Sequence, residues 1–103
     1  MLTGKQRSYL KGLAQNLDPV VSIGKSGLSD TIRKAIDENL EANELVKVSI
    51  IGESELDPKE VCNQIAEELH AEFVQAIGKR FVLYRQAREK ENRRIILPRS
   101  PRA

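Results

Sequence analysis

The sequence predicts a single α/β domain with a mixed four-stranded sheet packed against helices. Helical and strand-like patterns alternate along most of the chain, which favours parallel strands joined by right-handed crossovers. The last two strand-like runs are separated only by Gly78 and Lys79, which favours an antiparallel hairpin. A chain of 103 residues has room for one such domain. We expect it to span residues 1–98, followed by a flexible basic tail at residues 99–103.

The first half of the chain is expected to form a helix, a strand and a second helix. Thr3 caps a helix whose inward stripe recurs at helical spacing: Gln6, Leu10, Leu13 and Leu17. Asp18-Pro19 ends this helix, because the residue before a proline disfavours the helical region. Residues 20–23 follow as a short strand. Ser29 then caps the second helix, which has an inward stripe of Leu28, Ile32, Ile36 and Leu40.

The second half is expected to form a strand, a third helix and the hairpin. Residues 45–51 alternate apolar and polar side chains, as a strand with one buried face does. Asp57, Pro58 and Glu60 form a helix start, and the stripe behind it is Val61, Cys62, Ile65 and Leu69. Residues 73–77 and 80–85 pair through a type II′ turn. The pattern then dissolves: residues 95–97 add at most a short edge strand, and most of the tail is expected to be mobile.

Charge is segregated along the chain, although the net charge is only +2. Residues 1–35 hold six Lys/Arg against two acids, residues 36–75 hold two against eleven, and residues 76–103 hold nine against two. This distribution indicates an electropositive surface formed by the two ends of the chain, which attracts a polyanion, and an acidic surface formed by the middle. The alternative is that the charges only form the solvated faces of helices.

The run Gly24-Lys25-Ser26-Gly27 is the candidate binding motif. It lies between a predicted strand and a helix start, where unpaired backbone N–H groups and the positive end of the helix dipole can face an anion. Its glycines permit close approach of a phosphate, and Lys25 adds a positive charge. The alternative is that the glycines only make a tight turn. A nucleotide-binding P-loop is disfavoured, because Pro19 occupies the position of the first glycine in that motif.

The other reactive side chains are better explained by structure than by chemistry. Cys62 lies on an apolar helix stripe, and His70 follows the third helix without a paired nucleophile. One cysteine alone makes neither a disulfide nor a zinc site, which indicates a reducing, cytoplasmic compartment. No apolar run approaches the roughly 20 residues that a membrane span needs. We therefore expect no catalytic residue, metal or cofactor, while Tyr9 and Tyr84 are open between packing and stacking on a base.

Four sequence runs occur in order at residues 2–10, 18–19, 23–28 and 77–85: LTGKQRSYL, DP, IGKSGL and IGKRFVLYR. Together they resemble the CRM domain (chloroplast RNA splicing and ribosome maturation), and in particular its bacterial stand-alone form of the YhbY type. The resemblance covers residues 1–98 and implies a helix before a βαβαββ core, similar to the C-terminal domain of translation initiation factor three. It also implies RNA binding by the glycine loop and an adjacent basic surface, which by position are Gly24, Lys25, Ser26, Gly27, Lys5, Arg7 and Lys11. From their nearness in the sequence pattern and their charge, we expect five further cations to bind RNA: Arg33, Lys34, Lys79, Arg80 and Arg85.

The sequence thus favours a cytoplasmic RNA-binding protein that is not an enzyme. The resemblance implies ribosomal RNA in a precursor of the large ribosomal subunit as the target, with ribosomal proteins as further partners. One alternative is an adaptor that uses the acidic surface between Asp37 and Glu68 to bind a basic ribosomal protein. The other is a small phosphoryl-transfer enzyme, for which the sequence offers no convincing magnesium ligand or general base.

Overall fold

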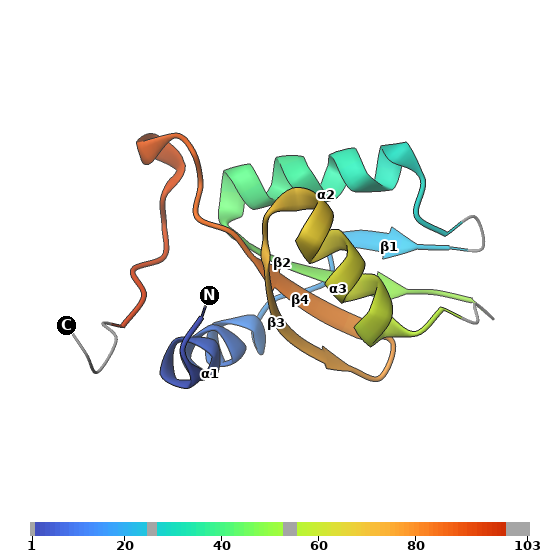
Figure 1. The fold of residues 1–103 in the computed structure, drawn as a ribbon, viewed down its shortest axis with the longest axis horizontal. Helices are drawn as coiled ribbons and strands as arrows, with labels where there is room; N and C mark the ends of the chain where they lie inside the picture. Colours follow the sequence, from blue (N-terminus) through green and yellow to red (C-terminus); the bar gives the residue numbers. More distant parts are fainter. Residues whose placement is uncertain (1, 25–26, 53–55, 99–103) are drawn as a thin grey trace.

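The protein forms three helices and a four-stranded sheet, in the order that the sequence predicts (Figure 1). The computed structural model describes residues 2–24, 27–52 and 56–98. A short 3₁₀ helix, η1 (Lys90–Asn92), is an addition to the expected order. The other elements are α1 (Gly4–Ala14), β1 (Val21–Ile23), α2 (Asp30–Asn43), β2 (Leu45–Ile50), α3 (Pro58–Leu69), β3 (Glu72–Ile77) and β4 (Arg80–Tyr84).

The sheet is mixed, with strand order β1-β2-β4-β3. β1 runs parallel to β2, whereas β4 is antiparallel to both β2 and β3. A parallel pair needs a crossover, which α2 provides, and an antiparallel pair needs only a tight turn. Gly78 in that turn has a φ of +59°, which a glycine adopts without steric cost. The predicted α/β fold class and its parallel and antiparallel pairings are confirmed.

The three predicted helix caps are all present. Thr3 forms a reciprocal capping box with Gln6, in which the backbone N–H of each residue donates to the side chain of the other at 3.0 and 3.1 Å. The Ser29 Oγ accepts from the N–H of Ile32 at 3.2 Å. Asp57 caps α3 ahead of a proline at the first helical position. Each cap satisfies backbone donors that the helix itself leaves unpaired, which stabilises it by about 1 kcal/mol.

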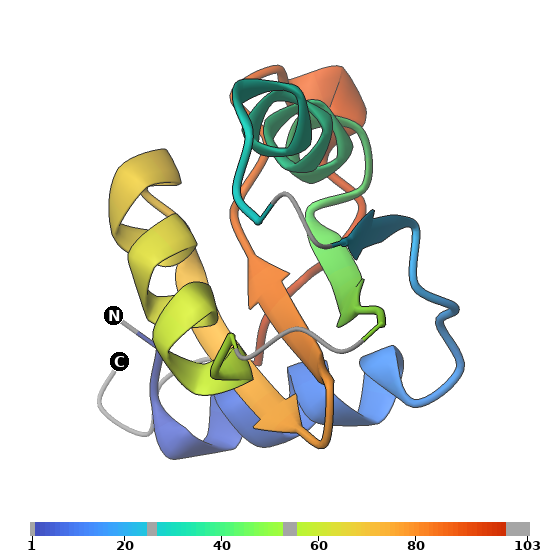
Figure 2. The ribbon, with the colours of Figure 1, turned by 90° about the vertical axis from the view of Figure 1, so that its right-hand side faces the viewer.

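Helices cover both faces of the sheet (Figure 2). α2 and α3 pack on one face over the larger apolar cluster, whose biggest fully buried side chains include Phe81, Ile36, Leu40 and Ile65. α1 packs on the other face over a smaller cluster that contains Leu10, Ala14, Leu45, Val74, Val82 and Tyr84. Phe81 and Tyr84 belong to the same strand and point to opposite faces, as the alternation of a strand requires.

The first helix is shorter than predicted. It ends at Ala14, and the N–H of Leu17 then bonds to the Ala14 carbonyl at 3.0 Å in a tighter turn. The chain leaves the helix there to return to the sheet, where the N–H of Val20 donates to the carbonyl of Lys47. Leu13 and Leu17 are consequently 37% exposed rather than core residues. The chain follows the predicted helical periodicity only as far as Ala14. The end of the helix is therefore not set by Asp18-Pro19.

The segment after β4 also differs from the prediction. Residues 95–97 pair with no strand, and the chain instead passes through η1 and lays Ile95 and Leu97 against the α1-side cluster. Gln6 fastens the end of this segment by donating from Nε2 to the Pro98 carbonyl at 3.1 Å. Residues 86–98 are therefore packed rather than loosely attached. The predicted basic tail at residues 99–103 lies outside the described residues.

Candidate nucleic-acid interface

Several chain segments meet at one end of the sheet, which we call the loop end. β1 and β2 finish there, β4 starts there, and the first turns of α2 and α3 open toward it (Figures 1 and 2). The N–H of Ile51 donates to the Ile23 carbonyl at 2.9 Å, and the N–H of Ile50 donates to the Lys79 carbonyl at 2.7 Å. These bonds tie the ends of β1 and β2 to the hairpin. The loop end is thus a single connected surface built from segments that are distant in the sequence.

The glycine motif lies at the loop end, directly before α2. Its two central residues, Lys25 and Ser26, are outside the described residues. The N–H of Gly27 donates to the Gly24 carbonyl at 3.0 Å, and Gly27 has a φ of +71°. Gly27 therefore has a conformational reason to be glycine. Gly24 has no such conformational reason to be glycine. Among the described residues, no atom lies within 4 Å of the place where its Cβ would stand, so they leave room for an anion at its backbone.

The hairpin brings Lys79 and Arg80 to the same end. Lys79 is exposed, and its Nζ donates to the carbonyl of Gly52 at 3.0 Å. Arg80 is exposed, and its guanidinium has no hydrogen-bond or ion-pair partner among the described residues. The structure therefore brings two of the predicted basic residues to the same end of the sheet as the glycine motif, with β2 lying between the motif and the hairpin.

The basic residues of α1 lie on a different part of the molecule. Lys5 and Lys11 are exposed, but Arg7 is only half-exposed and its Nε is buried without a partner. Arg7 follows the same side of the helix as Leu10 and Ala14, three and seven residues further on, which explains its partial burial. α1 contacts β2, β3 and β4 across the face opposite α2 and α3. Its cations do not adjoin those of α2.

The two predicted cations of α2 are already engaged. Arg33 donates from Nε to Glu68 Oε2 at 2.7 Å and from Nη1 to the Leu28 carbonyl at 3.0 Å, which joins α2 to α3. The hydrogen bond from Arg33 lowers the pKa of the Glu68 carboxyl below its ordinary value. Lys34 is exposed and lies 4.0 Å from Glu38. Arg33 thus acts largely within the fold, whereas Lys34 remains accessible to a ligand.

Arg85 was predicted as a binding residue, and the structure buries most of its side chain and engages its guanidinium within the fold. Its side chain is 9% exposed and its Nη1 lies 2.6 Å from Asp37 Oδ1 and 3.0 Å from the Leu69 carbonyl. Arg85 shares the strand parity of Phe81 and Leu83, which face the core beneath α2 and α3. This alternation along the strand was a signal in the sequence that Arg85 faces the core rather than solvent. Its guanidinium links α2 to the end of α3.

Sequence reasoning missed a set of polar residues on the α1 side of the sheet. Outward positions of a strand alternate, and in this sheet they include Ser22 on β1, Lys47 and Ser49 on β2 and Gln75 on β3. In the sequence, these residues are only the polar positions of strands in which apolar and polar side chains alternate. Their neighbours in space come from other strands, so no local signal distinguished them from an ordinary solvated face.

The residues that the structure describes supply no catalytic constellation. No three His, Cys, Asp or Glu side chains in these ranges gather where a metal ion could be held. Cys62 is fully buried, and burial raises the pKa of its thiol to about 12. His70 ends α3 with a left-handed φ of 55°. Within the same ranges, no helix is both long and apolar enough to cross a membrane.

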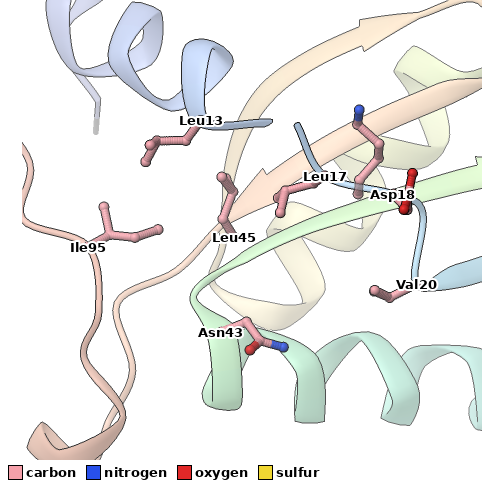
Figure 3. Close-up of a pocket in the computed structure, with 8 residues that line it drawn as sticks. Leu13, Leu17, Asp18, Val20, Asn43, Leu45 and Ile95 are labelled. Carbon is pink, nitrogen blue, oxygen red and sulfur yellow. The ribbon is translucent and has the colours of Figure 1, made fainter. Parts of the chain in front are cut away.

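A cavity of about 430 Å³ lies between the end of α1, the start of β2 and the C-terminal segment (Figure 3). Leu13, Leu17 and Ile95 approach Leu45 around it. Its charged lining residues are Asp18 and Lys47. The lining is mainly apolar and offers no paired nucleophile and base, so the cavity does not suggest a reaction.

Comparisons with known proteins agree with the resemblance seen in the sequence. The family model described as the CRS1 / YhbY (CRM) domain matches residues 2–85. A Bacillus subtilis protein named "Probable RNA-binding protein YqeI" is 42% identical over 98 residues, which cover 95% of this chain and 100% of the relative. A Haemophilus influenzae protein named "RNA-binding protein" is 40% identical over 98 residues, which cover 95% of this chain and 96% of the relative.

A solved structure has the same architecture. The solution structure of protein SAV1595 from Staphylococcus aureus superposes with a TM-score of 0.77 at 42% sequence identity. The match covers 95% of this chain and 100% of that one.

Proposed function

Because the chain belongs to the CRS1/YhbY (CRM) domain family, we propose that it binds RNA and holds the RNA backbone at the loop end. The names of its Bacillus subtilis and Haemophilus influenzae relatives describe those proteins as RNA-binding, which supports this function. The observation that carries the proposal is that the glycine motif, the start of α2 and the Lys79-Arg80 hairpin all lie at one end of the sheet. Backbone N–H groups, a helix dipole and cations attract phosphates without reading base sequence.

The acidic residues of the middle segment argue against the adaptor function. Asp37, Glu41, Glu44 and Glu68 all hold hydrogen bonds within the fold. A docking surface for a basic protein needs carboxylates that are free to pair with that protein. These four of the eleven acids of residues 36–75 are instead engaged in internal contacts.

The finer part of the proposal is that the bound RNA belongs to a precursor of the large ribosomal subunit and that the protein acts during assembly without catalysing a reaction. The family resemblance is its support. Crosslinking in cells, followed by sequencing of the attached RNA, tests it. Recovery of large-subunit precursor RNA above mature ribosomal RNA is the expected result, and recovery dominated by unrelated transcripts would overturn the assembly function while leaving RNA binding intact.

Binding at the loop end is tested by Lys25→Ala, with Lys90→Ala as the matched control on η1 at the opposite end of the sheet. Removal of a phosphate contact should weaken binding of all sequences alike and reduce the salt dependence by about one contact. Titration of structured RNA at several salt concentrations measures both quantities. The control should bind as the parent does. Equal affinities and salt slopes for the parent and Lys25→Ala would exclude the glycine motif from the interface.

A further inference from the structure

The α1-side face of the sheet is left open next to the loop end. The register aligns Ser22, Ser49, Arg80 and Ile77 in one row across β1, β2, β4 and β3. The next row contains Lys47, Val82 and Gln75. α1 ends at Ala14 and covers Val82 and the rows beyond it, so the first row remains uncovered. We call Ser22, Lys47, Ser49, Gln75 and Arg80 the open sheet face.

This face contains a hollow with a basic and amide lining. A depression of about 290 Å³ lies among Gln15, Lys47, Gln75, Ile77, Arg80 and Val82. No carboxylate lines it. The hydroxyls of Ser22 and Ser49 lie 3.2 Å apart in the adjoining row. The hollow is therefore bounded by two cations, two amides and a nearby hydroxyl pair.

Both cations of the open sheet face are free to bind a ligand. Neither the Lys47 amine nor the Arg80 guanidinium has a hydrogen-bond or ion-pair partner in the described part of the chain. Lys47 is half-buried and lines the hollow, as expected for a lysine whose aliphatic stem is covered while its charged end stays accessible. Two unpaired cations on a rigid sheet, beside a hydroxyl pair and without a carboxylate in the hollow, complement a chain of phosphates and sugars.

We propose that the open sheet face binds the ribose-phosphate backbone of double-helical RNA, with phosphates on Lys47 and Arg80 and ribose hydroxyls on Ser22, Ser49 and Gln75. The proposal rests on RNA binding at the adjoining loop end and adds the form of the RNA. Single strands are held chiefly by stacking of bases on aromatic rings. This face has none, because Phe81 and Tyr84 are buried. An A-form helix instead displays its 2′-hydroxyls in a wide, shallow minor groove, which polar side chains on a sheet can reach.

The cations are tested with Lys47→Gln/Arg80→Gln, and the control Arg88→Gln/Lys90→Gln removes the same charge near η1. Each variant is titrated with duplex RNA, duplex DNA of the same sequence and single-stranded RNA at several salt concentrations. Loss of both cations should weaken duplex RNA binding by roughly tenfold or more and reduce the salt slope by about two phosphate contacts. The control should retain the affinity of the parent. Lys47→Arg/Arg80→Lys, which keeps both charges, should restore most of the binding.

The hydroxyls are tested with Ser22→Ala/Ser49→Ala. Affinity for duplex RNA should fall by roughly threefold to tenfold while affinity for duplex DNA stays unchanged, because only RNA offers the 2′-hydroxyl. If the double glutamine variant loses thermal stability, Lys47→Gln alone tests the open sheet face, because the loop end does not share this residue. Parent-like binding by a folded glutamine variant would overturn the proposal, and tighter binding of single strands than of duplex by the parent would overturn the duplex form. A parent protein that binds no RNA would instead refute the proposed function.

Discussion

The two ends of the sheet use charge in opposite ways. At the loop end, Arg80 has no partner in the described residues, and Lys79 holds only a backbone carbonyl. At the other end, two carboxylates accept hydrogen bonds from groups inside the protein. Glu44 is fully buried, and its carboxylate accepts from the N–H groups of Ala87, Arg94 and Ile95 at 2.6 to 2.9 Å.

Glu41 extends this second arrangement by accepting from the N–H groups of Arg88 and Glu89 and from the side chain of Asn92. We call Glu41 and Glu44, with the segment 87–95 that they hold, the carboxylate clamp. The carboxylates of Glu41 and Glu44 there close the fold, whereas the guanidinium of Arg80 at the loop end is left for a ligand. The positions of charged residues in the sequence do not distinguish the two ends. The distinction comes from the structure, which shows which charged side chains have partners inside the protein and which do not.

The carboxylate clamp should fail most severely when Glu44 is removed. Glu44→Ala leaves three backbone N–H groups without their acceptor inside the protein, so we expect a loss of about 3 kcal/mol or more in the free energy of unfolding. Urea denaturation measures it. Glu38→Ala, at an exposed position of the same helix, should change this free energy by no more than about 0.5 kcal/mol. Similar losses for the two variants would show that the clamp contributes little.

The ion pair between Arg85 and Asp37 at the same end should give the next largest effect. Asp37→Ala removes the carboxylate from the nearly buried Arg85 guanidinium, whose Nε already lacks a partner. We expect a loss of about 2 kcal/mol, because the hydrogen bond that disappears is charge-assisted. Asp37→Asn keeps an oxygen acceptor and should lose less. Thermal and urea unfolding of both variants measure these losses of stability. Equal losses for Asp37→Ala and Asp37→Asn would mean that the charge of Asp37 does not contribute to the ion pair.

Acid should weaken the carboxylate clamp. Hydrogen bonds from the N–H groups of Arg88 and Glu89 lower the pKa of Glu41. Burial alone would raise the pKa of Glu44, but hydrogen bonds from Ile95, Ala87 and Arg94 outweigh it, so this pKa also lies below the ordinary value of 4.5. Their stabilisation is therefore complete above about pH 4.5 and is lost as the pH falls through the lowered values.

Unfolding free energies of the parent and of Glu44→Gln between pH 7 and pH 3 test this dependence. The parent should lose stability more steeply below about pH 4.5 than the variant, which has no carboxylate to protonate at position 44. Amide hydrogen exchange at residues 87, 94 and 95 should accelerate over the same range. Parallel pH curves for the two proteins would contradict a role for the Glu44 charge.

The loop end should give the smallest effect on stability. Arg80→Gln removes a guanidinium without an internal partner in the described residues, so its free energy of unfolding should stay within about 0.5 kcal/mol of the parent value. The same urea experiment applies. A loss as large as that of Asp37→Ala would show that Arg80 supports the fold and would remove the contrast between the two ends.

The sequence predicts those features whose causes lie within a few residues. Thr3 and Ser29 cap helices because their partners are three positions away, and the alternation through β2 follows directly from its pleat. The glycine motif and the Lys79-Arg80 hairpin were identified for the same reason. Their meeting at one end of the sheet followed from the predicted fold class, because parallel strands finish at the same edge.

The features that were missed depend on distant partners. Glu44 appeared to be one of many solvent-facing acids, and its three donors lie 43 to 51 residues further along the chain. The same distance hid the packed course of residues 86–98, which carries no strand pattern. Arg85 was grouped with the basic hairpin although Asp37, 48 residues away, holds it inside. Local periodicity contains no information about such pairings.

The hydrogen bonds of Glu44 also determine which substitutions are tolerated at the positions that donate to it. The donors it holds are main-chain N–H groups, and every residue type except proline carries one. Exposed Arg94 can therefore be exchanged for almost any other amino acid without loss of that bond. Insertion of a residue between Ala87 and Arg94, or a proline at position 94, would displace or delete a donor. We therefore expect homologous chains to vary the side chain at position 94, but to keep the spacing of the segment, the carboxylate at position 44 and the buried Ala87.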